Sequence, residues 1–238
     1  MEKLNGKKVL IAGATGGIGS QAARMLAGSG AEVYLTGRKA DRLAALADSI
    51  GVPHDRCFVT DLTDAAAVAS MAEDITRRCG PIDILVNASG IGIIKPVEQL
   101  SPEEFNLTLQ ANLTAAFLLV RAFLPGMKEV KKGLIINIPG VLGKVPMAGA
   151  AAYSASKYGL VGMMQSIREE LKRTEIRITN LFMGGVDSPF WDTIDLRVQK
   201  DRMIRSEEAA RAIWFLCQQP LSGVVSEMVL QPFNHQAI

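Results

Sequence analysis

The fold of this chain is decided by one stretch near its N-terminus, Lys8-Val9-Leu10-Ile11-Ala12-Gly13-Ala14-Thr15-Gly16-Gly17-Ile18-Gly19. Its first five residues form a short apolar run typical of a buried strand, and helical periodicity follows the glycines to about Gly28. Glycines allow a tight turn and let the backbone approach a phosphate, while the start of a helix offers free N–H groups. The stretch therefore predicts a strand-turn-helix unit that binds a nucleotide.

The rest of the chain repeats this alternation of short apolar runs and longer helical segments. Further strands are expected at 32–36, 57–60, 82–86, 133–137, 176–182 and 228–230, and helices over 63–78, 102–124, 151–172 and 206–218. Near-continuous Val, Ile and Leu in the strands is typical of a parallel sheet covered on both faces. We predict a single doubly wound α/β domain of Rossmann type over 1–238, with a mostly parallel sheet of about seven strands.

The composition excludes several classes of protein. Hydrophobic residues make up 48% and charged residues 21% of the chain, which excludes a disordered protein. A formal charge of +2 argues against nucleic acid as a partner. No run approaches the ~18 apolar residues of a membrane span, and three cysteines and two histidines argue against disulfides and metal sites. We expect a cytoplasmic protein with no nucleic-acid, membrane or metal partner.

The glycine spacing and four later motifs together resemble the classical short-chain dehydrogenase/reductase family. The motifs, which occur in the family's order over essentially the whole chain, are Asp61-Leu62, Asn87-Ala88-Ser89-Gly90, Asn112, Tyr153-Ser154-Ala155-Ser156-Lys157 and Gly184-Gly185-Val186-Asp187-Ser188. The resemblance implies hydride transfer with a small carbonyl or alcohol substrate, and a homodimer or homotetramer. It implies that a nicotinamide cofactor is bound by Gly13, Thr15, Gly17, Ile18, Gly19, Asp61, Leu62, Asn87, Ala88, Gly90, Tyr153, Lys157 and Val186.

The end of the second strand indicates which nicotinamide is used. Proteins that bind NAD place a carboxylate near this point for the ribose 2′-OH, but here Gly37 is followed by Arg38. A guanidinium matches a 2′-phosphate in charge and geometry, so the sequence predicts NADP(H) with Arg38 on that phosphate. One feature counts against this prediction, since Gly16 stands where NADP-preferring relatives often carry a second basic residue.

The catalytic prediction rests on two residues four positions apart. Tyr153 and Lys157 share one face of a helix, where the ammonium can lower the pKa of the phenol so that it exchanges a proton near neutral pH. The resemblance implies that Tyr153 is the acid/base, that Lys157 also holds the nicotinamide ribose, and that Asn112 holds a water that relays protons.

The chain departs from the family at Gly140. The family has a catalytic serine thirteen residues before the tyrosine, and here Gly140 occupies that place, after Pro139. Losing one hydrogen-bond donor to the substrate oxygen typically costs on the order of 10²–10³ in rate. Three explanations stay open: another donor (Ser89, a water or a backbone N–H), a slow enzyme or a substrate with its own donor, or cofactor binding without turnover. The alternative function is thus a catalytically weakened or inactive NADP(H)-binding protein, acting as a sensor or assembly partner.

The resemblance places a substrate lid at about 187–205. Its aromatic residues Phe190 and Trp191 predict either an apolar pocket wall or ordinary packing. Its basic residues, among them Lys200 and Arg205, predict either attraction of an anionic substrate or a solvated face.

Overall fold

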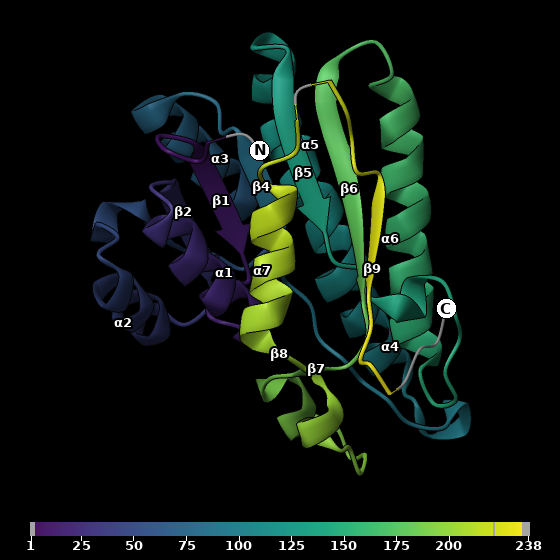
Figure 1. Cartoon of the computed structure of the whole chain (residues 1–238). Coiled ribbons are helices and arrows are strands. Elements are labelled where there is room, and N and C mark those ends of the chain that lie inside the picture. The colour runs from purple at the N-terminus through teal and green to yellow at the C-terminus, as the bar shows by residue number, and fades with distance from the viewer. Residues whose placement is uncertain (1–2, 221, 235–238) are drawn as a thin grey trace.

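A parallel sheet of seven strands forms the centre of the molecule, as the computed structural model shows over residues 3–220 and 222–234 (Figure 1). The strand order is β3-β2-β1-β4-β5-β6-β9, and every pairing in this sheet is parallel. The strands are β1 (Lys8–Ala12), β2 (Glu32–Gly37), β3 (Cys57–Val59), β4 (Ile84–Asn87), β5 (Lys132–Asn137), β6 (Glu175–Met183) and β9 (Glu227–Leu230). The predicted doubly wound sheet of about seven strands is confirmed.

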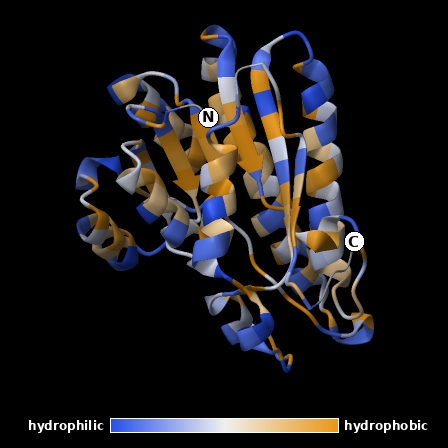
Figure 2. Ribbon diagram, viewed as in Figure 1, coloured by the Kyte–Doolittle hydropathy of each residue, from blue (hydrophilic) through white to orange (hydrophobic). Residues whose placement is uncertain are grey.

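Helices cover both faces of the sheet. One face carries α1 (Gly17–Gly28), α2 (Ala40–Ile50) and α7 (Ser206–Leu216), and the other carries α3 (Ala65–Cys79), α5 (Ala115–Glu129) and α6 (Ala151–Glu170). Successive strand residues point to opposite faces, so Ile11 packs toward α1 while Leu10 packs toward α3 and α5. Because both of their faces are buried, the central strands β1, β4 and β5 are mostly apolar, whereas β6 and the edge strand β9 carry more polar residues (Figure 2).

The helix predicted at 102–124 is longer and interrupted. It runs as α4 (Pro102–Leu109), a π-helical segment (Gln110–Thr114) and α5. Taken together, Pro102–Glu129 is long and apolar enough to cross a membrane by length and composition alone, which corrects the expectation that no run of the chain approaches a membrane span. Its buried residues, Leu119 and Phe123 among them, pack against the sheet as in the core helix of a globular domain.

A small second sheet closes a loop at the carboxyl ends of the main strands. β7 (Val186–Asp187) pairs with β8 (Ile204–Arg205), so the two ends of the segment 188–203 lie side by side. This segment contains the short helical turns Pro189–Thr193 and Lys200–Arg202 and lies at the bottom of Figure 1. It corresponds to the predicted lid, whose β7–β8 pairing the sequence did not reveal.

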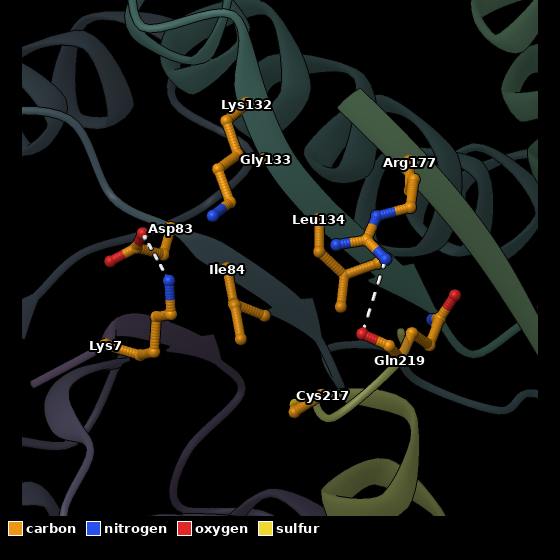
Figure 3. A pocket seen from close by; sticks show the side chains of 9 residues that line it. All are labelled: Lys7, Asp83, Ile84, Lys132, Gly133, Leu134, Arg177, Cys217 and Gln219. Atoms are coloured by element: carbon orange, nitrogen blue, oxygen red, sulfur yellow. Dashed lines mark hydrogen bonds and ion pairs between the residues drawn. The ribbon is translucent and has the colours of Figure 1, made fainter. Parts of the chain in front are cut away.

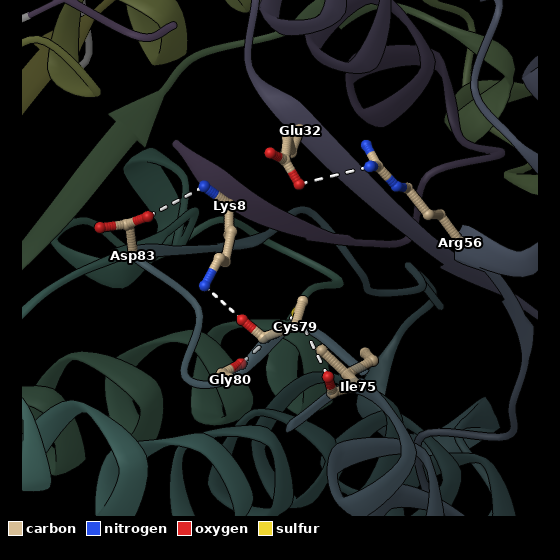
Figure 4. A network of polar contacts seen from close by, with 7 residues as sticks. All are labelled: Lys8, Glu32, Arg56, Ile75, Cys79, Gly80 and Asp83. Atoms are coloured by element: carbon tan, nitrogen blue, oxygen red, sulfur yellow. Dashed lines mark hydrogen bonds and ion pairs between the residues drawn. The ribbon is translucent and has the colours of Figure 1, made fainter. Parts of the chain in front are cut away.

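The opposite, amino edge of the sheet is held by a polar network (Figure 4). The main-chain N–H of Lys8 donates to Asp83 Oδ2 at 2.9 Å, and Lys8 Nζ donates to the main-chain oxygen of Cys79. Arg56 pairs with Glu32 at 3.3 Å. These contacts connect β1 to the end of α3 and β2 to the turn before β3.

A cavity of about 30 Å³ lies at the same amino edge (Figure 3). Lys7, Asp83, Lys132, Arg177 and Cys217 are among the residues that line it. Lys7 pairs with Asp83 at 3.5 Å, and burial raises the pKa of the Cys217 thiol to about 12, so this sulfur is neutral and unreactive near neutral pH. The cavity is separated from the glycine-rich turn by the length of the sheet.

Candidate functional site

The glycine-rich turn lies between the carboxyl end of β1 and the start of α1. Gly13 has a φ of +75°, which favours glycine, and a Cβ there would lie 2.8 Å from the main-chain oxygen of Ala88. A Cβ on Gly19 would overlap the main-chain oxygen of Gly13. The turn is therefore folded so tightly that glycine is required at both positions.

The first turn of α1 has no side-chain cap. Its N-cap residue, Gly16, makes no side-chain hydrogen bond to the N–H groups of the helix. Such groups, at the positive end of the helix dipole, favour a phosphate. The uncapped helix and the compact turn fit the pyrophosphate of a dinucleotide.

The ends of β2 and β3 bring Arg38 close to Asp61. Asp61 accepts hydrogen bonds from the N–H and hydroxyl of Thr63 at 2.9 and 2.8 Å. These bonds lower the pKa of the Asp61 carboxyl, and the positive charge of Arg38 lowers it further. A Cβ on Gly37 would lie 3.2 Å from Thr15 Oγ1, so Thr15 fills the space that a side chain at position 37 would need.

The loop after β4 is held by hydrogen bonds of the Asn87 side chain. Asn87 is 4% exposed, and its Nδ2 donates to Asn137 Oδ1 at 3.3 Å. Its Oδ1 accepts the Ser89 hydroxyl at 2.6 Å. The Asn87 side chain therefore braces the loop, and the Ser89 hydroxyl already has an acceptor inside the protein.

Tyr153 and Lys157 lie on successive turns of α6, at the carboxyl edge of the sheet. Lys157 Nζ lies 5.4 Å from the centroid of the Tyr153 ring and donates to the main-chain oxygen of Ile138 at 3.1 Å. Lys157 is only 4% exposed, and a Cβ on Gly90 would lie 3.5 Å from its Nζ. The structure thus brings together the two residues predicted to be reactive and sets them against the loop after β4.

Burial shifts the pKa values of both residues. It raises the pKa of Tyr153 to about 12 and lowers the pKa of Lys157 to about 8. The predicted lowering of the tyrosine pKa by the ammonium is therefore not found in the chain by itself. The cause is desolvation, because burial disfavours the charged phenolate relative to the neutral phenol. Near neutral pH Tyr153 is a protonated phenol that can donate its proton.

Asn112 connects the loop after β4 to α6. It is 1% exposed, its Nδ2 donates to Ile91 O and Ser156 Oγ, both at 3.0 Å, and its Oδ1 accepts the Ile91 N–H at 2.8 Å. Ser156 Oγ in turn donates to the main-chain oxygen of Tyr153 at 2.7 Å. Asn112 lies in the π-helical segment, a local irregularity of the kind often found at functional sites.

Gly140 adopts a conformation that serine rarely takes. Its φ is +68° and its ψ is 172°, a region occupied almost only by glycine. A Cβ there would meet only the main-chain oxygen of Met183, at 3.4 Å, so there is space for a side chain. The backbone conformation is therefore what disfavours a serine hydroxyl at this position.

The aromatic residues of the 188–203 segment pack onto the reactive tyrosine. The ring centroids of Phe190 and Tyr153 are 5.8 Å apart, and Trp191 lies edge-on to Phe190 at 5.3 Å. Trp191 Nε1 donates to Val186 O at 2.8 Å. One basic residue of the segment, Lys200, is paired with a carboxylate of the same segment, Asp192, at 2.7 Å.

The other predicted residues divide into two groups. Thr15, Gly17 and Ala88 lie at the turn and loop described above, and a Cβ on Gly17 would lie 2.6 Å from the Cβ of Ser188. Leu62 and Val186 are instead buried in the core, and Ile18 is partly buried against it.

Two residues of this site were missed by sequence reasoning. Ser156 links Asn112 to α6, and its signal was its place inside the Tyr-x-x-x-Lys motif. Gly92 receives the ring of Phe190, which a Cβ at this position would overlap. Its only signal was a second glycine shortly after Gly90.

Comparisons with known proteins give separate evidence about the chain. The family model described as short chain dehydrogenase matches residues 7–198. D-threitol dehydrogenase of Mycolicibacterium smegmatis is 32% identical over 225 residues, which cover 90% of this chain and 86% of that protein. A metagenomic short-chain oxidoreductase solved with NADP is 32% identical, with a TM-score of 0.83 and coverage of 98% and 100%. An alcohol dehydrogenase of Thermococcus sibiricus solved with 5-hydroxy-NADP is 26% identical, with a TM-score of 0.86 and coverage of 98% and 99%.

Proposed function

This chain belongs to the short-chain dehydrogenase family, and from that premise we propose that it transfers a hydride between NADP(H) and the carbonyl or alcohol carbon of a small substrate. It is an oxidoreductase whose cofactor is NADP(H). The choice of Tyr153 as acid/base and the nature of the substrate are the parts that we propose. The observation that carries them is the pair formed by Tyr153 and the buried Lys157 at the carboxyl edge of the sheet.

Tyr153 and Lys157 have different roles in the proposed reaction. When bound, the cofactor supplies or accepts the hydride at its nicotinamide ring. Tyr153 donates its phenolic proton to the substrate oxygen during reduction and takes it back during oxidation. Lys157 spends one of its three N–H donors on Ile138 O, which leaves donors for the ribose and a positive charge beside the phenolate.

The missing serine leaves the orientation of the substrate oxygen to another group. Ser89 is a poor substitute, because its hydroxyl donates to Asn87 Oδ1 at 2.6 Å. A water or a backbone N–H therefore has more support as the substitute donor. The relatives are named as oxidoreductases and dehydrogenases, so the non-catalytic alternative is not favoured.

We propose that the working form contains two or four copies. Three large apolar side chains lie exposed on α4 and α5, with exposed fractions of 37% for Phe105, 49% for Leu107 and 46% for Phe117. A second copy would cover this surface, and light scattering of the purified protein measures the number of copies. The cytoplasmic location stays a prediction.

The decisive experiment compares Tyr153→Phe with Tyr158→Phe. Both lie on α6, but Tyr158 is 44% exposed and makes no part of the site. NADPH oxidation is measured over a panel of aldehydes, ketones and keto acids, with NADPH binding followed by fluorescence in parallel. We expect turnover by the wild type and by Tyr158→Phe, and loss of about 10³-fold or more with Tyr153→Phe, with NADPH binding kept. Turnover that survives Tyr153→Phe would refute the assignment.

A further inference from the structure

One aromatic ring occupies the space beside the reactive phenol. Phe190 stands 5.8 Å from Tyr153, ring centroid to ring centroid, with an angle of 53° between the planes. The ring is part-buried although it comes from a segment that leaves the body of the protein at Val186 and returns at Ile204. The ring of Phe190 therefore bounds the space beside the Tyr153 ring on one side, and we call it the wall of the site.

The ring is seated in a notch that requires glycine. A Cβ on Gly92 would overlap the ring end of Phe190 and would lie 3.1 Å from Ile194 Cδ1. Gly92 belongs to the loop after β4, which Asn112 fixes through two hydrogen bonds to Ile91. The loop that forms the notch is therefore tied to the body of the protein next to Gly92, and the ring of Phe190 and Ile194 both lie against it.

The neighbouring indole keeps the ring in place. Trp191 packs edge-on against Phe190, with an angle of 86° between the ring planes, and its Nε1 donates to Val186 O at 2.8 Å. Val186 is 6% exposed and belongs to the β7–β8 pair at the base of the segment. The position of Phe190 is thus fixed at both sides, by the notch and by the anchored indole.

The wall beside Tyr153 is formed by apolar side chains, with Phe190 against the phenol ring, Trp191 against Phe190, and Ile194 next to Phe190 at Gly92. The cation of Lys200 is paired with Asp192 at 2.7 Å and that of Arg205 with Glu208, also at 2.7 Å. Both pairs are exposed to solvent and each of these two cations already has a carboxylate partner, so neither is held ready for a substrate carboxylate at the wall.

We propose that Phe190 is the residue that sets substrate specificity, by restricting the site to compact, uncharged carbonyl compounds and their alcohols. This inference rests on the proposed function, because it names the substrate class for Tyr153. Bulky aryl ketones are excluded by the ring itself, and keto acids are excluded because the wall leaves their carboxylate without a partner.

The test measures binding first, so that it does not depend on turnover. The full-length protein saturated with NADPH is titrated by calorimetry with a short alkyl ketone, an aryl ketone and a keto acid of matched length. We expect the alkyl ketone to bind the wild type at least about tenfold more tightly than the other two. Phe190→Ala should bind the aryl ketone at least about tenfold more tightly than the wild type does, and should bind the alkyl ketone more weakly. Trp191→Phe, which loses the bond to Val186, should shift the affinities in the same direction by less.

The matched control is Phe215→Ala, an exposed aromatic on α7 that is 47% exposed and away from the wall. It should leave all three affinities within about twofold of the wild type. An aryl ketone that binds Phe190→Ala no better than the wild type, or a keto acid that binds the wild type best, would overturn the inference. So would a wild type that binds none of the three. If the expected preferences are found but no ketone is reduced, the proposed function fails while the specificity assignment stands.

Discussion

The ammonium of Lys157 donates a hydrogen bond of 3.1 Å to the main-chain oxygen of Ile138, two residues before Gly140. This bond joins α6 to the end of β5 and fixes the lysine before any ligand arrives. Lys157 is 4% exposed, so its charge is buried with one acceptor for three donors. The site therefore holds an unfavourable charge that a bound ribose hydroxyl would relieve.

Lys157→Met should stabilise the protein without cofactor. The pKa of Lys157 is lowered from 10.5 to about 8, so the folded state disfavours the charged form. The sign follows from proton binding: between about pH 8 and 10.5 the unfolded chain binds more protons, so stability rises with pH through this window. Below it, the ammonium costs about 3 kcal/mol, which Lys157→Met removes.

Urea unfolding at about pH 7 and about pH 10 measures this prediction. The gain from Lys157→Met should be largest at the lower pH and shrink toward the higher one. The control is Lys172→Met, whose side chain is 65% exposed and which should show no such dependence. Equal gains in stability at both pH values would contradict a buried Lys157 with a lowered pKa.

Gly140→Ser should destabilise the protein and should not raise its activity. The residue has a φ of +68°, where a side chain costs about 1–3 kcal/mol although the site has room for it. Gly162→Ser is the control, because Gly162 lies in α6 with nothing near its missing Cβ. Thermal unfolding should show a lower midpoint for Gly140→Ser than for the wild type, and an unchanged midpoint for Gly162→Ser. A Gly140→Ser protein of unchanged stability and higher turnover would show that the backbone accepts the serine.

The fold could be predicted because its signals are local. The apolar runs at 8–12 and 133–137 are strands because both faces of the sheet are covered, and the Tyr153/Lys157 spacing places both on one helix face whatever surrounds them. Because several of the motifs directly follow a predicted strand in the chain, their positions at the ends of those strands could be predicted as well.

What could not be predicted depends on contacts distant in sequence. The contact of Phe190 with Gly92 joins residues almost a hundred positions apart, and the raised pKa of Tyr153 is a consequence of its burial between elements distant in sequence. The positive φ of Gly140 also has no sequence signal beyond the glycine itself. Each of these arises when separate elements meet at the carboxyl edge of the sheet.

Gly19→Ala should abolish NADPH binding. A Cβ at Gly19 would overlap the main-chain oxygen of Gly13, so the turn must open and the cradle for the pyrophosphate is lost. Gly28→Ala lies in the same helix with nothing near its missing Cβ and is the matched control. Fluorescence titration with NADPH should give a loss of about 100-fold or more for Gly19→Ala and an unchanged affinity for Gly28→Ala. Equal affinities would mean that the ligand does not use this turn.

Asn112→Ala should loosen the loop after β4. The change leaves the Ile91 N–H and oxygen without their partner, at a cost of about 1–3 kcal/mol. Hydrogen exchange of the Ile91 amide should become faster, and it reports this bond directly. Asn106→Ala, an exposed change in α4, should leave that amide protected. An Ile91 amide that is equally protected in both variants would assign the anchoring to other residues.

Arg38→Ala should weaken NADPH binding and spare NADH. Arg38 lies at the end of β2, where its charge acts on Asp61, and no carboxylate can take its place at Gly37 without moving Thr15. A charge-assisted bond to the 2′-phosphate is worth about 1.5–3 kcal/mol, so the NADPH dissociation constant should rise about 10–100-fold. Arg42→Ala, on the exposed side of α2, controls for the loss of one positive charge. Loss of NADH affinity to the same extent would mean that Arg38 holds the adenosine, with no part in choosing between the two cofactors.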